Sequence, residues 1–284
     1  MTPSGILAAA ITPRRGLTPD LAASADLSAF LASKGVAGIV LFGSTGEFVH
    51  FDLEARAHLA REVIKRASVP VLVNVSHSTL DGTVELARRA IGDGAAAAVA
   101  MPPYYFRYNQ TQLRDFFLRL GDSMEGPLSL YNIPLFTSEL SRETAAELLR
   151  TGRFCALKDS SGDNSYLEFL RPASAGIKLY VGNDPCYWKL KAEGVVDGAV
   201  SGIASVAPDL MLAIDRGCPP AEALLHRFLE WFGKFPIPSA IGQALEVRCG
   251  YPCPSATPIA GPELDRFRAW VREWISEVEA ICKI

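Results

Sequence analysis

Residues 69–101 read VPVLVNVSHSTLDGTVELARRAIGDGAAAAVAM. The stretch begins with a short apolar run, passes through a polar turn into an amphipathic segment, and ends on a second apolar run. In the middle segment Leu80, Val84, Ala87 and Ile91 recur at the spacing of one helical face. The two apolar runs are continuous rather than alternating, which is typical of parallel strands buried on both faces. The stretch therefore predicts a strand, a helix and a second strand parallel to the first.

The same unit recurs along the chain at intervals of roughly 20 to 35 residues, about the length of one strand and one helix. Apolar runs begin near Gly5, Gly38, Val69, Ala95, Pro127, Cys155, Ile177 and Gly198. Eight strands, each followed by a helix, predict a closed (β/α)₈ TIM barrel of the α/β class. An open, doubly wound sheet is the alternative, but the first turn, residues 12–16, lacks the GxGxxG fingerprint of that fold.

The residues after the eighth unit predict helices. One apolar stripe has alternating spacings of three and four residues, and consists of Leu264, Phe267, Val271, Trp274, Val278 and Ile281. We expect residues 1–218 to form a catalytic barrel and residues 219–284 to form a C-terminal helical extension packed on it as a single structural unit. The apolar stripe is interpreted either as an extra core layer or as an oligomer surface.

Composition excludes several classes of protein. Apolar residues make up 49% of the 284 residues and charged residues 21%, the balance of a soluble globular protein. The net charge of −3 disfavours binding to nucleic acid or to an anionic membrane, because both need a basic surface. No apolar run approaches the roughly 18 residues of a membrane-spanning helix, and the first residues do not resemble a secretion signal. We therefore expect a cytoplasmic protein without nucleic-acid or membrane partners.

The cysteines do not predict a disulfide framework or a metal site. Six cysteines are scattered along the chain and are interpreted as reduced, small apolar residues. Cys249 and Cys253 are the only close pair, and one such pair without a second pair of ligands is a weak basis for zinc.

Barrel enzymes carry their reactive groups at the carboxyl ends of the strands. Polar segments follow four of the predicted strands, namely GSTGE (43–47), Tyr104–Tyr105, YNIP (131–134) and KDSSG (158–162). Lys158 is the most informative of these residues, because it ends an otherwise apolar run and lysine is rarely buried without a reason. Burial favours the neutral amine, which can attack a ketone to form a Schiff base. The alternative is a strand-end lysine whose ammonium reaches solvent.

Each of the other three segments is consistent with a catalytic or binding role and also with a purely structural one. The turn at residues 43–47 offers hydroxyls and backbone N–H groups for a small carboxylate, although an ordinary glycine loop after a strand is the more common explanation of such a turn taken alone. The phenol of Tyr131 can relay protons if it points into the barrel mouth, or can be a satisfied core tyrosine. Tyr104 and Tyr105 are interpreted as a packed loop or as an interface aromatic pair.

At these residues the chain resembles the dihydrodipicolinate synthase / N-acetylneuraminate lyase family of pyruvate-dependent class I aldolases. The likeness covers the whole chain in order, through ITP (11–13), GSTGE, PPYY (102–105), YNIP, LKDSSG, GND (182–184) and PIP (236–238). The resemblance implies an enzyme without metal or organic cofactor, usually a homotetramer made of two tight dimers, that acts on pyruvate or another 2-oxo acid.

The resemblance also implies roles for individual residues. Lys158 would form the imine, Tyr131 would shuttle protons, and the hydroxyl of Ser44 would join a relay with Tyr105 that reaches across a dimer interface. The implied substrate-binding residues are Thr12, Gly43, Thr45, Gly46, Phe136 and Val200, of which Val200 contributes a backbone carbonyl near the keto acid.

One position departs from the dihydrodipicolinate synthases. Those enzymes carry an arginine two residues after the YNxP proline, where this chain has Phe136. A phenyl ring cannot form the bidentate contact that an arginine makes with a carboxylate. The chain therefore resembles the 2-keto-3-deoxy sugar acid and 4-hydroxy-2-oxoglutarate aldolase branch more than the synthases, unless Arg107 supplies the missing cation.

The leading hypothesis is a carbon–carbon lyase that cleaves or forms a 4-hydroxy-2-oxo acid through a Schiff base, with pyruvate as the keto component and a small or sugar-derived aldehyde. Two alternatives share the lysine imine: dihydrodipicolinate synthase, which condenses pyruvate with aspartate semialdehyde, and a keto-deoxy sugar acid dehydratase. A non-catalytic keto-acid-binding protein is a further alternative, but it would be expected to lack Lys158 or Tyr131, and both are present.

Overall fold

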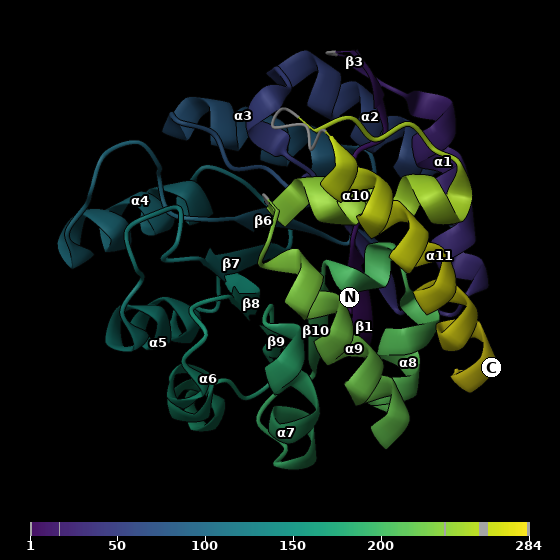
Figure 1. The fold of residues 1–284 in the computed structure, drawn as a ribbon. Helices are drawn as coiled ribbons and strands as arrows, with labels where there is room; N and C mark the ends of the chain where they lie inside the picture. The colour runs from purple at the N-terminus through teal and green to yellow at the C-terminus, as the bar shows by residue number, and fades with distance from the viewer. Residues whose placement is uncertain (1, 17, 236, 256–260, 283–284) are drawn as a thin grey trace. The chain divides into compact units, whose positions relative to one another are not determined.

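The structure is a computed structural model that describes residues 2–16, 18–235, 237–255 and 261–282. Among these residues, eight strands close into a barrel in the order β1-β10-β9-β8-β7-β6-β5-β4 (Figure 1). The barrel strands are β1 (Gly5–Ala9), β4 (Gly38–Leu41), β5 (Val71–Asn74), β6 (Ala97–Ala100), β7 (Leu128–Asn132), β8 (Phe154–Asp159), β9 (Lys178–Val181) and β10 (Gly198–Ser201). The predicted TIM barrel is confirmed.

A helix follows each barrel strand, as the repeated unit predicts. These helices are α1 (Leu21–Ser33), α2 (Leu53–Arg66), α3 (Leu80–Gly92), α4 (Gln110–Asp122), α5 (Arg142–Arg150), α6 (Asn164–Leu170), α7 (Tyr187–Ala192) and α8 (Pro208–Asp215). Helix α3 is the one predicted from residues 69–101. The Thr79 hydroxyl caps its first turn by accepting a hydrogen bond from the Gly82 amide, and Val84 and Ala87 on its apolar face are buried.

The chain folds as two compact units, which are described separately. One unit comprises residues 1–5 and 70–200, and the other comprises residues 6–69 and 201–284. In the first unit β5 to β10 pair in parallel, with Tyr131 of β7 directly opposite Lys158 of β8. In the second unit Leu7 of β1 pairs with Gly38 of β4. The division at residue 218 into barrel and extension stays a prediction.

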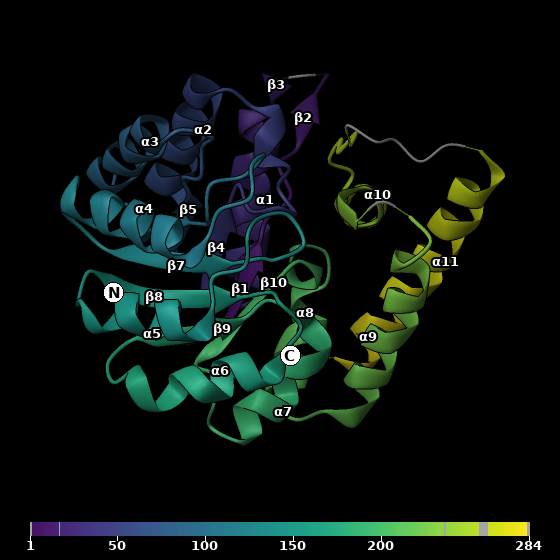
Figure 2. The ribbon, with the colours of Figure 1, turned by 90° about the vertical axis from the view of Figure 1, so that its left-hand side faces the viewer.

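Three helices end the second unit: α9 (Pro219–Phe232), α10 (Ile237–Cys249) and α11 (Pro262–Ile281). Figure 2 shows α9 and α11 running side by side. Their contact is an aromatic cluster of Phe228, Trp231, Phe235, Phe267, Trp270 and Trp274. Trp274 is fully buried, and its indole N–H donates to the Leu224 carbonyl at 3.0 Å.

The structure refines the predictions for this region. Phe267, Val271, Trp274 and Val278 of the predicted stripe are buried on α11, whereas Ile281 is 43% exposed because the helix ends there. Helix α10 was not predicted, and neither was a short antiparallel hairpin of β2 (Arg14–Arg15) and β3 (Thr18–Pro19). In the part of the chain that the structure describes, no helix combines the length and apolarity needed to cross a membrane.

Candidate active site

The first unit buries a lysine against a tyrosine at neighbouring strand ends. Lys158 and Tyr131 pair across β8 and β7, and their side chains are 8% and 2% exposed. The amine Nζ of Lys158 lies 4.2 Å from the centroid of the Tyr131 ring. The arrangement follows from the strand register, because residues that are directly opposite on neighbouring strands point to the same face of the sheet. The amine is therefore enclosed by the protein rather than exposed to bulk water.

Gly182, which follows β9, makes room for this lysine. A Cβ atom at Gly182 would lie 2.7 Å from Lys158 Cε and 2.0 Å from Ser160 Oγ, closer than side-chain atoms approach one another. Only glycine fits beside the lysine stem without moving it. Sequence reasoning included Gly182 in a family motif but assigned it no role, because the close approach arises between residues far apart along the chain.

The other predicted residues of the first unit lie on β10 and on two loops. Val200 is buried on β10. Phe136 lies in the loop between β7 and α5 and is 52% exposed, so its ring is accessible. Arg107 donates from Nη1 to the carbonyl of Thr137 at 2.5 Å. Because Thr137 directly follows Phe136, this hydrogen bond holds the Arg107 guanidinium close to Phe136.

Tyr105 is a highly exposed aromatic residue. Its side chain is 89% exposed, and its backbone has a positive φ of 86°, a conformation that a tyrosine rarely adopts. The Tyr105 ring contacts Phe106 edge-on, with 4.9 Å between the ring centroids, and Phe106 is 66% exposed. The loop therefore presents an exposed aromatic pair.

The GSTGE turn of the second unit is rigid. The Gly46 amide donates to the Gly43 carbonyl and the Glu47 amide to the Ser44 carbonyl, while the Thr12 hydroxyl donates to the Gly46 carbonyl at 2.9 Å. A Cβ atom at Gly46 would lie 2.9 Å from the Ala10 carbonyl oxygen, so glycine is required there. The structure thus places Thr12 as a support of the turn, while Ser44 and Thr45 are half-buried on it.

Glu47 anchors the turn to the region after α10. Its carboxylate accepts a hydrogen bond from the Ser255 hydroxyl at 2.8 Å and lies 3.6 Å from the guanidinium of Arg14, which is buried. The Arg14 amide donates to the Pro252 carbonyl. From the sequence, Glu47 was recognised only as part of the turn, and Arg14 was not predicted to belong to the site.

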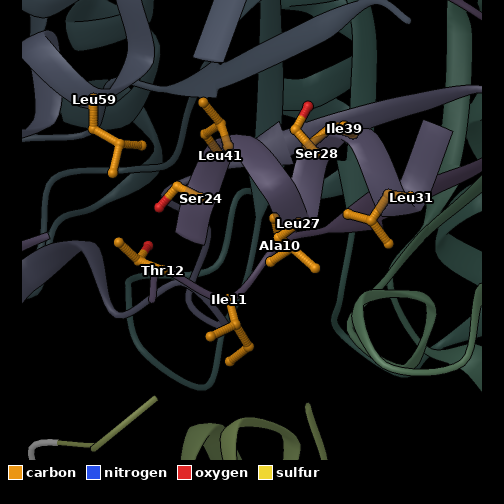
Figure 3. Close-up of a pocket in the computed structure, with 10 residues that line it drawn as sticks. All are labelled: Ala10, Ile11, Thr12, Ser24, Leu27, Ser28, Leu31, Ile39, Leu41 and Leu59. Carbon is orange, nitrogen blue, oxygen red and sulfur yellow. The ribbon is translucent and has the colours of Figure 1, made fainter. Parts of the chain in front are cut away.

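A small cavity in the second unit lies between α1, strand β4 and residues 10–12, which follow β1 (Figure 3). Ile39 and Leu41 line it from alternate positions of β4, so it lies on the helix side of that strand. Its lining is mostly leucine and isoleucine, together with Ser24 and the buried Ser28. Of the predicted site residues, all of which the structure describes, Thr12 is the one that lines it. The cavity is therefore not assigned to the candidate site.

The described cysteines do not form a metal centre. Within residues 2–16, 18–235, 237–255 and 261–282, no group of three or more His, Cys, Asp or Glu side chains is arranged to hold a metal ion. Burial raises the pKa of the Cys249 and Cys253 thiols, and the thiolate is the form that binds metal.

Comparisons with known proteins agree with the fold. The model of the dihydrodipicolinate synthetase family matches residues 2–219. A probable 2-dehydro-3-deoxy-D-pentonate aldolase of Escherichia coli K12, YjhH, is 31% identical over 213 residues, which cover 72% of this chain and 70% of that protein. A 4-hydroxy-tetrahydrodipicolinate synthase of Hyphomonas neptunium is 31% identical over 236 residues, which cover 79% and 80%.

Two crystal structures resemble the whole chain. KD(P)GA from T. tenax has a TM-score of 0.87 and 26% identity, covering 96% of this chain and 99% of that one. YagE from E. coli K12, in complex with pyruvate, has a TM-score of 0.87 and 25% identity, covering 96% and 98%. The fold and these relatives define a carbon–carbon lyase built on a TIM barrel. The chain belongs to the dihydrodipicolinate synthetase family, and the predicted family and enzyme class are confirmed.

Proposed function

We propose that this chain is a Schiff-base-forming class I aldolase that cleaves or forms a 4-hydroxy-2-oxo acid, with pyruvate as the keto component. The observation that carries the proposal is the amine of Lys158, buried 4.2 Å from the ring of Tyr131 at adjacent strand ends. In a TIM barrel the carboxyl ends of all strands meet at one end, where active sites are built. Lys158 and Tyr131 are the penultimate residues of β8 and β7, and the GSTGE turn follows β4.

The reaction begins with imine formation. The amine of Lys158 attacks the C2 ketone of the substrate to form a carbinolamine. Tyr131 then gives its phenolic proton to the carbinolamine hydroxyl, which leaves as water to give a protonated imine and a Tyr131 phenolate. Ser44 and Thr45 bind the substrate carboxylate through their hydroxyls and backbone N–H groups, while Thr12 supports this turn. The Val200 carbonyl lies beside the bound keto acid.

Cleavage then uses the imine as an electron sink. The Tyr131 phenolate removes the proton of the C4 hydroxyl, the C3–C4 bond breaks, and its electron pair forms an enamine with the imine carbon. The aldehyde leaves, and Tyr131 returns this proton to C3. Water then hydrolyses the protonated imine to release pyruvate and free Lys158, and the proton set free returns to the Tyr131 phenolate. Reversal of these steps forms the carbon–carbon bond.

Trapping the imine tests the proposal. Pyruvate and sodium borohydride added together should reduce the imine and leave a covalent three-carbon adduct on Lys158, detected by mass spectrometry of the protein and its peptides. Lys158→Met should abolish the adduct. Lys178→Met is a matched control, because Lys178 also belongs to a barrel strand but pairs with Asp197, and this variant should form the adduct. Absence of an adduct on the native protein would refute the proposal.

The aldehyde is proposed to be a small hydroxyaldehyde rather than a carboxylated one. The support is Phe136, which presents an accessible phenyl ring where the dihydrodipicolinate synthases have an arginine. A five-carbon 2-oxo-3-deoxy acid cleaved between C3 and C4 leaves a two-carbon hydroxyaldehyde, and the six-carbon acid leaves a three-carbon one. Rates with these acids, compared with condensation of pyruvate and aspartate semialdehyde, separate the aldolase from the synthase. Dehydrated product in place of pyruvate would identify the dehydratase.

We also propose a homotetramer made of two dimers, in which Tyr105 enters the relay of a neighbouring subunit with Ser44. The exposed aromatic pair of Tyr105 and Phe106 supports this assembly. Light scattering should give the mass of the tetramer, and Tyr105→Phe should slow borohydride trapping of the pyruvate imine without dissociating the tetramer.

A cytoplasmic location is proposed as well, supported by six free cysteines.

A further inference from the structure

Two buried residues directly follow the lysine and the tyrosine of the site. Asn132 follows Tyr131 on β7, and Asp159 follows Lys158 on β8. Successive side chains on a strand point to opposite faces of the sheet, so Asn132 and Asp159 lie on the face away from Lys158 and Tyr131. The Asn132 amide Nδ2 donates to Asp159 Oδ1 at 2.7 Å, and both residues are almost completely buried.

The remaining polar atoms of this pair hold the adjoining loops. Asn132 Oδ1 accepts a hydrogen bond from the Leu140 amide at 3.0 Å. Asp159 Oδ2 accepts from the Ser161 hydroxyl at 2.7 Å and from the Ser161 amide at 3.3 Å. The Leu140 carbonyl in turn accepts from the Tyr166 hydroxyl of α6 at 2.8 Å. One connected network therefore joins β7, β8, the start of α6 and both loops that follow the strands.

We infer that Asn132 and Asp159 are positioning residues, which lock the register of β7 and β8 so that the Lys158 amine lies over the Tyr131 ring. Through Leu140 the same pair holds the end of the 133–140 loop, which carries Phe136. The inference deepens the proposed aldolase function and rests on it for its kinetic test. Neither residue touches the substrate, because their side chains face away from the Lys158 side of the strands.

Two physical arguments favour this role over an incidental buried contact. A slip of one residue between β7 and β8 would turn every side chain of the slipped strand to the other face, which would separate the amine from the phenol. The Asn132–Asp159 pair opposes such a slip, because the slip would leave the buried amide of Asn132 and the buried carboxylate of Asp159 without hydrogen-bond partners. Burial raises the pKa of Asp159, and the hydrogen bonds from Ser161 and Asn132 act in the opposite direction, so the network offsets part of the cost of a buried carboxylate.

The test exchanges the two side chains. Asn132→Asp places two carboxylates together, and Asp159→Asn places two amides together. The double variant Asn132→Asp/Asp159→Asn restores one amide and one carboxylate, with an acceptor for Leu140 and one for Ser161. Each single variant should slow borohydride trapping of the pyruvate imine at saturating pyruvate by about 10- to 100-fold, since a displacement of about 1 Å costs this much. The half-saturating pyruvate concentration should change little, and the double variant should recover most of the rate.

Two further variants separate positioning from general stability. Ser174→Ala removes a buried hydrogen bond from Ser174 to the Leu170 carbonyl in the same unit, and should lower the melting temperature without slowing trapping. Ser161→Ala keeps both members of the pair but removes one hydrogen bond to Asp159, and should give a smaller version of the single-variant effect. Single variants that trap at the native rate, or a double variant no faster than the singles, would overturn the inference.

A second readout does not depend on catalysis. Reductive methylation with ¹³C-formaldehyde labels the lysine amines, and the Lys158 signal is identified by its loss in Lys158→Met. The Tyr131 ring should shift that signal away from those of the exposed lysines, the single variants should remove the shift, and the exchange should restore it. This pattern without a pyruvate adduct on the native protein would refute the proposed function and retain the positioning role. An equal shift in all variants would refute the positioning role.

Discussion

Gly182→Ala should impair imine formation more than it impairs folding. The added Cβ would lie 2.7 Å from Lys158 Cε, whereas carbon atoms in contact are about 3.5–4.0 Å apart, so the lysine stem must retreat by about 1 Å. The Asp159 carbonyl oxygen, at 3.2 Å, must also give way slightly. The Ser160 hydroxyl, at 2.0 Å, belongs to a short side chain that can rotate. The strain therefore falls mainly on the flexible end of the lysine.

These distances set the expected magnitudes. Overpacking of this kind costs about 1–3 kcal/mol of unfolding free energy, and we expect the lower half of that range because a lysine stem yields more readily than backbone. A displacement of about 1 Å at the reacting amine reduces the rate about 100-fold. The change in rate, converted to free energy, should therefore be as large as the change in stability or larger.

The assay measures borohydride trapping of the pyruvate imine alongside urea unfolding. Gly92→Ala is the matched control, because a Cβ at Gly92 of α3 would meet nothing within 4 Å, and this variant should trap at the native rate. A folded Gly182→Ala variant that traps pyruvate as fast as the native protein would refute the steric argument. It would also show that the lysine has more room than the structure indicates.

Three further predictions concern stability and substrate choice. Asp209→Asn should lower the unfolding free energy by about 3–5 kcal/mol at pH 7, because Arg248 binds the buried carboxylate through two hydrogen bonds. Burial acts to raise the pKa of Asp209, but Arg248 outweighs it and lowers this pKa below its ordinary value, so the stabilisation exists at neutral pH and is lost as the pH falls through the lowered pKa. Urea unfolding at pH 7 and pH 3 should show a smaller difference at pH 3, and equal differences would contradict the argument. Trp274→Ala should cost about 3–5 kcal/mol and exceed the cost of the less buried Trp270→Ala, as measured by chemical unfolding. Phe136→Arg should leave the melting temperature unchanged because the side chain is exposed, and should raise the condensation rate of pyruvate with aspartate semialdehyde relative to a neutral hydroxyaldehyde; an unchanged ratio would refute the role of this position in substrate choice.

Hydrophobic patterning along the chain was sufficient to predict the barrel. Continuous apolar runs such as 95–101, each separated from the next by a helical period, leave few arrangements other than a parallel sheet covered by helices. Where this pattern was weak, prediction failed. Helix α10 contains Pro238 and Gly242, and the β2–β3 hairpin has only two residues in each strand, so neither has a long periodic signal.

The candidate site divides in the same way. Lys158, Tyr131 and the GSTGE turn were recognisable in the sequence because each places unusual chemistry at the end of an apolar run. The hydrogen bond between the neighbouring residues Asn132 and Asp159 could not be predicted from the sequence. These residues are 27 positions apart, and only the register of β7 on β8 brings them within hydrogen-bond distance. The same holds for Gly182, whose missing side chain matters only because the lysine stem passes beside it. Local patterning determines which residues end each strand, because burial and backbone hydrogen bonding act along the chain. Which of those residues meet depends on how the strands align when the barrel closes, and that alignment is a property of the folded sheet.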